Sequence, residues 1–149
     1  MLPQATDPPH ATPDRCTLSP DRILLYALLS QVLGFVHGVL NTDNMSIMGL
    51  TIDYGPFGFL EHFDPDYTPN GSDGTARYTY ENQPSVCRWN LLKLAEMLDP
   101  LLPLAQAKEI LARYDEVYDE LYMSFMRAKL GLLTRQTAAG NDIKQLVSY

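Results

Sequence analysis

The chain has 149 residues, 46% of them hydrophobic, which is enough for one domain at most and a modest core. Its net charge of −7 and the absence of a Lys/Arg cluster argue against nucleic acid and against an anionic membrane surface as the main partner. No uninterrupted apolar run approaches about 18 residues, so the sequence predicts no transmembrane helix.

The sequence gives little sign of a targeting segment or a cysteine framework. The N-terminus lacks the basic stretch of a signal peptide and the Arg-rich character of a transit peptide, so this segment does not indicate a cellular compartment. Cys16 and Cys87 lie far apart without CxxC spacing. We therefore expect free thiols rather than a disulfide or a zinc site.

The elements predicted along the chain are mainly helical. Residues 1–20 hold five of the eleven prolines among polar residues, and we expect a disordered tail there. Apolar residues that recur at three- and four-residue steps predict helices at 22–35, 84–98 and 104–130, with Gly131 as a C-cap. The first of these helices is apolar around most of its circumference, which predicts burial on several sides.

The residues that carry chemistry gather around one short apolar hairpin. Residues 45–52 are predicted as two short strands with Gly49 as the turn between them. The two ends of a hairpin lie together, so Asn44 at one end and Asp53 at the other can converge on one point. Asp43 adds a third oxygen donor beside Asn44. Carboxylate and amide oxygens suit Mg²⁺, which takes one or two protein carboxylates and completes its shell with water and phosphate.

Each of these residues also has a structural interpretation. Asn44 can serve as a turn residue that bonds its own backbone, and Asp53 can close the hairpin in an Asp-aromatic-Gly turn. For His37 we favour a structural role, in which it holds the loop backbone by hydrogen bonds, over that of a general base. The acidic stretch 64–75 fails the EF-hand pattern, because Pro69 stands where that loop needs glycine. We interpret its acids as turn-forming and solvated.

The stretch from His37 to Leu60 carries a family resemblance. It reads His-Gly-Val-Leu-Asn-Thr-Asp-Asn-Met-Ser-Ile-Met-Gly-Leu-Thr-Ile-Asp-Tyr-Gly-Pro-Phe-Gly-Phe-Leu. Its Asp-Tyr-Gly stands where protein kinases have Asp-Phe-Gly, and Val39 stands where aminoglycoside-type phosphotransferases place their base. The whole stretch closely resembles the signature of the selenoprotein O family, the kinase-like protein adenylyltransferases. Two later segments resemble the same family, Arg77-Tyr78-x-Tyr80-x-x-Gln83-Pro84-x-x-Cys87-x-Trp89-Asn90-Leu91 and Lys129-Leu130-Gly131-Leu132.

This resemblance, from about residue 34 to about residue 133, implies a fold, a reaction and three residue roles. The fold is mainly α with a small β-hairpin, a fragment of a protein-kinase-like C-terminal lobe. The reaction is Mg²⁺-dependent AMPylation, in which AMP passes from ATP to a Ser, Thr or Tyr hydroxyl of a protein substrate. Asp43 matches the catalytic proton acceptor, and Asn44 and Asp53 match the metal ligands, with Asp53 also counted as cofactor-binding. The family suggests mitochondria for a eukaryotic source and the cytoplasm for a bacterial one.

A complete kinase-like enzyme also needs an N-terminal lobe with a glycine-rich loop, a phosphate-binding Lys and its Glu partner. No lysine precedes Lys93, so we expect that lobe to be missing and the isolated chain to be inactive. We divide the chain into a tail at 1–20, a C-lobe fragment at 21–133 and a polar, incomplete segment at 134–149. The alternative is a non-catalytic helical interaction module or an inert gene-model fragment.

Overall fold

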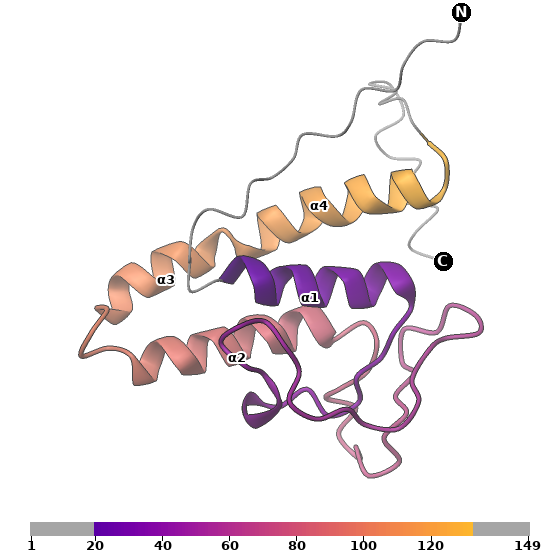
Figure 1. Cartoon of the computed structure of the whole chain (residues 1–149), viewed down its shortest axis with the longest axis horizontal. Helices are drawn as coiled ribbons and strands as arrows, with labels where there is room; N and C mark the ends of the chain where they lie inside the picture. The colour runs from indigo at the N-terminus through magenta and orange to yellow at the C-terminus, as the bar shows by residue number, and fades with distance from the viewer. Residues whose placement is uncertain (1–19, 133–149) are drawn as a thin grey trace, which may run out of the picture.

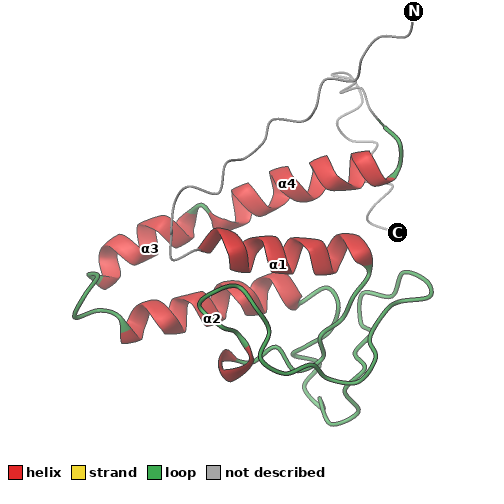
Figure 2. Cartoon of the chain, viewed as in Figure 1, coloured by secondary structure: helices red, strands yellow, loops and turns green. Residues whose placement is uncertain are grey.

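The computed structural model describes residues 20–132, which are mainly α-helical, as predicted (Figure 1). The elements are α1 at Pro20–Leu33, a 3-10 turn η1 at Thr42–Asn44, α2 at Gln83–Met97, α3 at Leu104–Ala112 and α4 at Tyr114–Lys129. This part of the chain contains no strand (Figure 2), only two isolated antiparallel bridges. The predicted disordered tail, up to residue 19, and the predicted polar segment 134–149 lie outside the described residues.

The helices stack in layers and enclose a small core. Figure 1 shows α1 between α2 and α4, and α3 packs against α2. The core draws apolar side chains from all four helices, among them Ile23, Ala27, Leu91, Leu111 and Tyr114. Much of the loop chain between α1 and α2 lies beside the end of the stack where α1 stops and α2 starts, while the tight turn at Gly49 reaches back to Arg22 near the start of α1. No helix between residues 20 and 132 is long and apolar enough to cross a bilayer.

The prediction of a single helix at 104–130 is wrong, because the chain forms two helices that are separated at Arg113. The main-chain N–H of Arg113 bonds the carbonyl of Ile110 at 3.3 Å, which closes α3 before α4 begins. The break lets α3 pack on α2 while α4 packs on α1. The end of α4 agrees with the prediction: Gly131 has a φ of 73°, and the Leu132 N–H bonds the Arg127 carbonyl at 2.8 Å.

The burial of α1 is less complete than its sequence predicts. Its neighbours cover Ile23, Ala27 and Leu28, but a stripe of leucines along the opposite side stays open to solvent. These leucines are Leu25, Leu29 and Leu33, with 42%, 37% and 63% of their surface exposed. Within residues 20–132 these three side chains stay partly exposed, so the prediction that α1 is buried on several sides does not hold for this side.

One of the two cysteines lies in the described part of the chain. Cys87 is a free thiol on the buried face of α2, and burial raises its pKa to about 12. A thiol with so high a pKa stays protonated and unreactive near neutral pH. Cys16 lies outside the described residues.

Candidate active site

The predicted hairpin is a tight reversal with a single bridge rather than a pair of strands. Met45 and Thr51 form that bridge, and the Ser46 N–H bonds the Leu50 carbonyl at 2.9 Å. Gly49 lies in the turn, as predicted, and its N–H bonds the Ser46 carbonyl at 2.9 Å. The arms do not extend because η1 precedes one arm directly and the chain bends after the other. The predicted fold included a small β-hairpin, and the structure has a tight turn with one isolated bridge in its place.

This reversal brings the main chains of the two predicted metal ligands together. The Asn44 carbonyl accepts the Ile52 N–H at 2.9 Å, so Asp53, the next residue, starts beside Asn44. The Asn44 side-chain amide donates to the Val39 carbonyl at 2.9 Å, which fixes its orientation. No described residue donates to its side-chain oxygen, which is therefore left to accept or to ligate.

Asp43, the predicted proton acceptor, is exposed on η1, and Asp53 is exposed at the start of the Asp-Tyr-Gly turn. Neither carboxylate forms an ion pair or a side-chain hydrogen bond with another described residue. Carboxylate and amide oxygens are the types of donor that Mg²⁺ prefers. Within residues 20–132 no group of three His, Cys, Asp or Glu side chains could hold a metal. A site here would therefore depend on Asn44 and on ligands from outside the chain.

The segment after Asp53 lies directly against the loop that begins at Gly34. The Val36 N–H bonds the Gly58 carbonyl at 2.7 Å, and the Leu60 N–H bonds the Gly34 carbonyl at 2.8 Å. A Cβ at Gly58 would lie 2.0 Å from the Val36 carbonyl oxygen, and one at Gly55 would lie 2.6 Å from that of His37. Only glycine allows the two backbones to approach this closely.

His37 links these two loops from the inside and has no exposed surface. Its Nδ1 accepts the Val39 N–H at 3.2 Å, its Nε2 lies 2.6 Å from the Thr51 hydroxyl, and its ring stacks on Tyr54. Burial lowers the pKa of His37, and the carbonyl and carboxylate of Asp53 oppose this only in part. A buried, neutral ring with both nitrogens engaged supports the structural role over that of a general base.

Side-chain amides hold the backbone of this loop from Phe35 to Leu40. Gln83 bonds the His37 N–H and the Phe35 carbonyl, Asn70 bonds the Gly38 carbonyl, Asn44 bonds the Val39 carbonyl, and Asn90 bonds the Leu40 carbonyl. Sequence reasoning did not find these supporting contacts. The sequence feature that could have indicated them is the position of Gln83 and Asn90. These two amides lie seven residues apart on the same buried face of α2 as Val86 and Cys87.

The acidic loop after the site uses its carboxylates to bond its own backbone. Asp64 accepts the Asp66 N–H at 3.1 Å, and Asp73 accepts the N–H groups of Arg77 at 3.1 Å and Tyr78 at 2.7 Å. The guanidinium of Arg77 lies 4.5 Å over the ring of Trp89 rather than on a nearby acid. These contacts agree with turn-forming acids and give no support to a calcium loop.

The comparison with known proteins assigns the chain to a family of nucleotide-transferring enzymes. The family described as protein adenylyltransferase SelO matches residues 26–149, more than four fifths of the chain. The chain therefore belongs to the SelO family. The match extends beyond the 34–133 stretch on which the sequence resemblance rests.

Relatives from animals and bacteria share about half or more of their residues with it. The chain is 62% identical over 104 residues to the human mitochondrial protein adenylyltransferase SelO. It is 58% identical over 106 residues to zebrafish mitochondrial SelO-1, and 52% over 113 residues to the protein nucleotidyltransferase YdiU of an Enterobacter strain. These matches cover 69%, 71% and 76% of this chain but only 16%, 15% and 23% of the relatives. The chain thus spans between a seventh and a quarter of the relatives' length.

Proposed function

We propose that this chain forms the Mg²⁺-binding, catalytic-loop part of a protein adenylyltransferase that transfers AMP from ATP to Ser, Thr or Tyr hydroxyls of proteins. The observation that carries the proposal is the pairing of the Asn44 carbonyl with the Ile52 N–H at 2.9 Å. That pairing starts Asp53 beside Asn44 within a segment that belongs to the SelO family. Residues 21–133 are then a fragment of a kinase-like C-terminal lobe.

The three predicted site residues divide the work between two tasks. Asn44 and Asp53 would hold Mg²⁺, and the open side-chain oxygen of Asn44 supports this assignment. Mg²⁺, when bound, draws charge from the phosphate oxygens of ATP. Asp43 is exposed, so a hydroxyl of a protein substrate can reach it. An ionised carboxylate beside Mg²⁺ is a weak base, so Asp43 orients the hydroxyl as much as it accepts the proton.

The proposed activity belongs to a longer protein than the chain described here. The relatives are four to seven times longer than their matched segments. Binding of ATP between two lobes requires residues that residues 20–132 do not supply. We expect the 149-residue chain alone to transfer little or no AMP.

The test replaces the matched segment of the Enterobacter YdiU relative with the corresponding residues of this chain, which are 52% identical. The hybrid is incubated with Mg²⁺, a protein substrate and ATP labelled on either the α- or the γ-phosphorus. Label transfer from α but not from γ is expected, because AMP rather than phosphate moves. Asp53→Ala should abolish transfer and Asp43→Ala should lower it by 10²-fold or more.

Asp66→Asn is the matched control, since it removes the charge of an exposed acid outside the site. It should leave transfer unchanged. Transfer that survives Asp53→Ala in a folded hybrid contradicts the proposal, as does transfer of the γ-phosphate.

The second candidate is a non-catalytic helical interaction module, and the exposed stripe of Leu25, Leu29 and Leu33 on α1 favours it. The same experiment separates the two candidates. A folded hybrid that transfers no label from either position supports the interaction module.

A further inference from the structure

One hydroxyl group, that of Thr51, contacts three of the residues around the candidate site. Its Oγ1 lies 2.6 Å from Nε2 of His37, 3.0 Å from the carbonyl oxygen of Asp53 and 3.3 Å from the carbonyl oxygen of Asn44. Thr51 itself lies one residue before Ile52, whose N–H completes the pairing with Asn44. A single side chain therefore joins the buried histidine to the main chains of both proposed metal ligands.

The direction of these hydrogen bonds follows from the surroundings of His37. Its Nδ1 faces the Val39 N–H at 3.2 Å and must accept, so in the neutral ring the proton sits on Nε2. Nε2–H then donates to the Thr51 oxygen. The Thr51 hydroxyl has one proton of its own, which it donates to the nearer carbonyl, that of Asp53. The chain of donors runs from Val39 through His37 and Thr51 to Asp53.

We propose that Thr51 is a positioning residue that sets the spacing between Asn44 and Asp53 and thereby the affinity of the site for a divalent cation. The inference rests on the proposed function, because it assumes that these two residues are the ligands. Groups that orient metal ligands through hydrogen bonds typically change metal affinity by about 10- to 100-fold when removed. Thr51 touches the carbonyl groups of the ligands, so it acts on their backbone and not on the metal.

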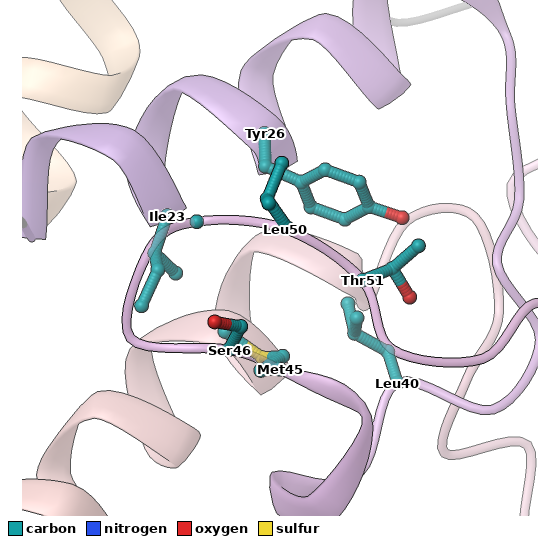
Figure 3. Close-up of a pocket in the computed structure, with 8 residues that line it drawn as sticks. Ile23, Tyr26, Leu40, Met45, Ser46, Leu50 and Thr51 are labelled. Carbon is teal, nitrogen blue, oxygen red and sulfur yellow. The ribbon is translucent and has the colours of Figure 1, made fainter.

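The other atoms of Thr51 offer a way to separate its hydroxyl from its packing. Thr51 lines a small void of about 10 Å³ between α1 and the tight turn, beside Tyr26 and Leu40 (Figure 3). Thr51→Val keeps the shape of the side chain and removes the hydroxyl. Thr51→Ser keeps the hydroxyl and removes the methyl group, and Thr51→Ala removes both. Within each of the pairs Thr/Val and Ser/Ala, only one member carries the hydroxyl. The first pair keeps the methyl group that packs in this region, and the second pair lacks it.

The experiment measures Mn²⁺ affinity of the 149-residue chain and its variants from the electron paramagnetic resonance signal of free Mn²⁺. Thr51→Val should bind Mn²⁺ about tenfold more weakly than the wild type, and Thr51→Ala about tenfold more weakly than Thr51→Ser. The Mn²⁺ affinity of Thr51→Ser should stay near that of the wild type. If one of the two pairs fails to fold, the other still decides. Affinities within twofold across a folded pair would overturn the proposal.

A second readout separates this inference from the proposed function. In ¹⁵N spectra, the His37 ring of the wild-type chain should show the Nε2–H tautomer, and the Ile52 N–H should exchange slowly with solvent. Loss of the hydroxyl should shift the Nε2 signal and speed the exchange of Ile52. If the wild type binds no Mn²⁺, the isolated chain does not assemble the proposed site, and these two signals then decide whether Thr51 holds the loops together. If neither signal moves in Thr51→Val, Thr51 does not position them.

Discussion

The side-chain carbonyl of Gln83 accepts a hydrogen bond from the main-chain N–H of His37 at 2.8 Å, although 46 residues separate them. The amide nitrogen of the same side chain donates to the Phe35 carbonyl at 2.9 Å. Gln83 is the first residue of α2 and is 2% exposed. The path of the candidate catalytic loop therefore depends on where α2 begins.

Gln83→Leu should lower the free energy of unfolding by about 2–4 kcal/mol. The substitution leaves a buried N–H at His37 and a carbonyl at Phe35 without partners, and each unsatisfied group costs about 1–3 kcal/mol. Urea denaturation followed by circular dichroism measures the loss. Gln106→Leu is the control, because Gln106 is exposed on α3 and its substitution should stay within about 0.5 kcal/mol. Equal stabilities of the two variants would contradict the role of Gln83.

Gly58→Ala should destabilise the chain by about 1–3 kcal/mol, since the backbone must move to admit a methyl group. The new Cβ would lie 2.0 Å from the Val36 carbonyl oxygen, where the two loops touch. Gly71→Ala serves as the control, because no atom lies within 4 Å of a Cβ at that position. Thermal unfolding compares the two. A midpoint for Gly58→Ala as high as that for Gly71→Ala would show that the loops do not pack this closely.

The local features of the fold were predictable, and the long-range ones were not. Helices predicted at 22–35 and 84–98 occur within two residues of those bounds, because apolar periodicity and Pro84 mark them locally. The break at Arg113 left no such mark. Apolar residues continue through it at helical spacing, and only the packing of α3 on α2 and α4 on α1 requires the chain to turn.

In the candidate site, too, the local features were predictable from the sequence and the long-range contacts were not. Asp43, Asn44 and Asp53 remain candidates, chosen for their order along the chain and for the family resemblance. The chain reversal that pairs Asn44 with Ile52, next to Asp53, was predicted, but as two strands rather than as a single bridge. Gln83 and Asn90 act on backbone groups 46 to 50 residues away. A polar side chain on an apolar helix face indicates a buried partner, but the sequence does not say which backbone group that partner is.

The stability of the chain should fall as the pH drops from 7.5 to 5.5, in part because of His37. Burial holds its pKa in the folded chain below the ordinary 6.5, so the unfolded chain takes up this proton first. Stability is therefore complete above pH 6.5 and decreases below it until the folded pKa is reached. Urea titrations at several pH values measure the slope.

His37→Gln removes this titration and should flatten the slope, whatever its effect on absolute stability. His62→Gln is the control, since His62 is exposed and its loss should keep the wild-type slope. A His37→Gln variant with an unchanged slope would show that the ring is not buried as a neutral group.

Two adjacent leucines on α1 should lose very different amounts of stability on the same substitution. Leu28 has no exposed surface, and Leu28→Ala should lower the free energy of unfolding by about 2–5 kcal/mol through lost contacts and the cavity left behind. Leu29 belongs to the open stripe, and Leu29→Ala should cost about 1 kcal/mol or less. Urea denaturation of the 149-residue chain measures both. Equal losses would mean that another part of the chain covers the stripe in solution, and the exposed face of α1 would then not be open for an interaction module.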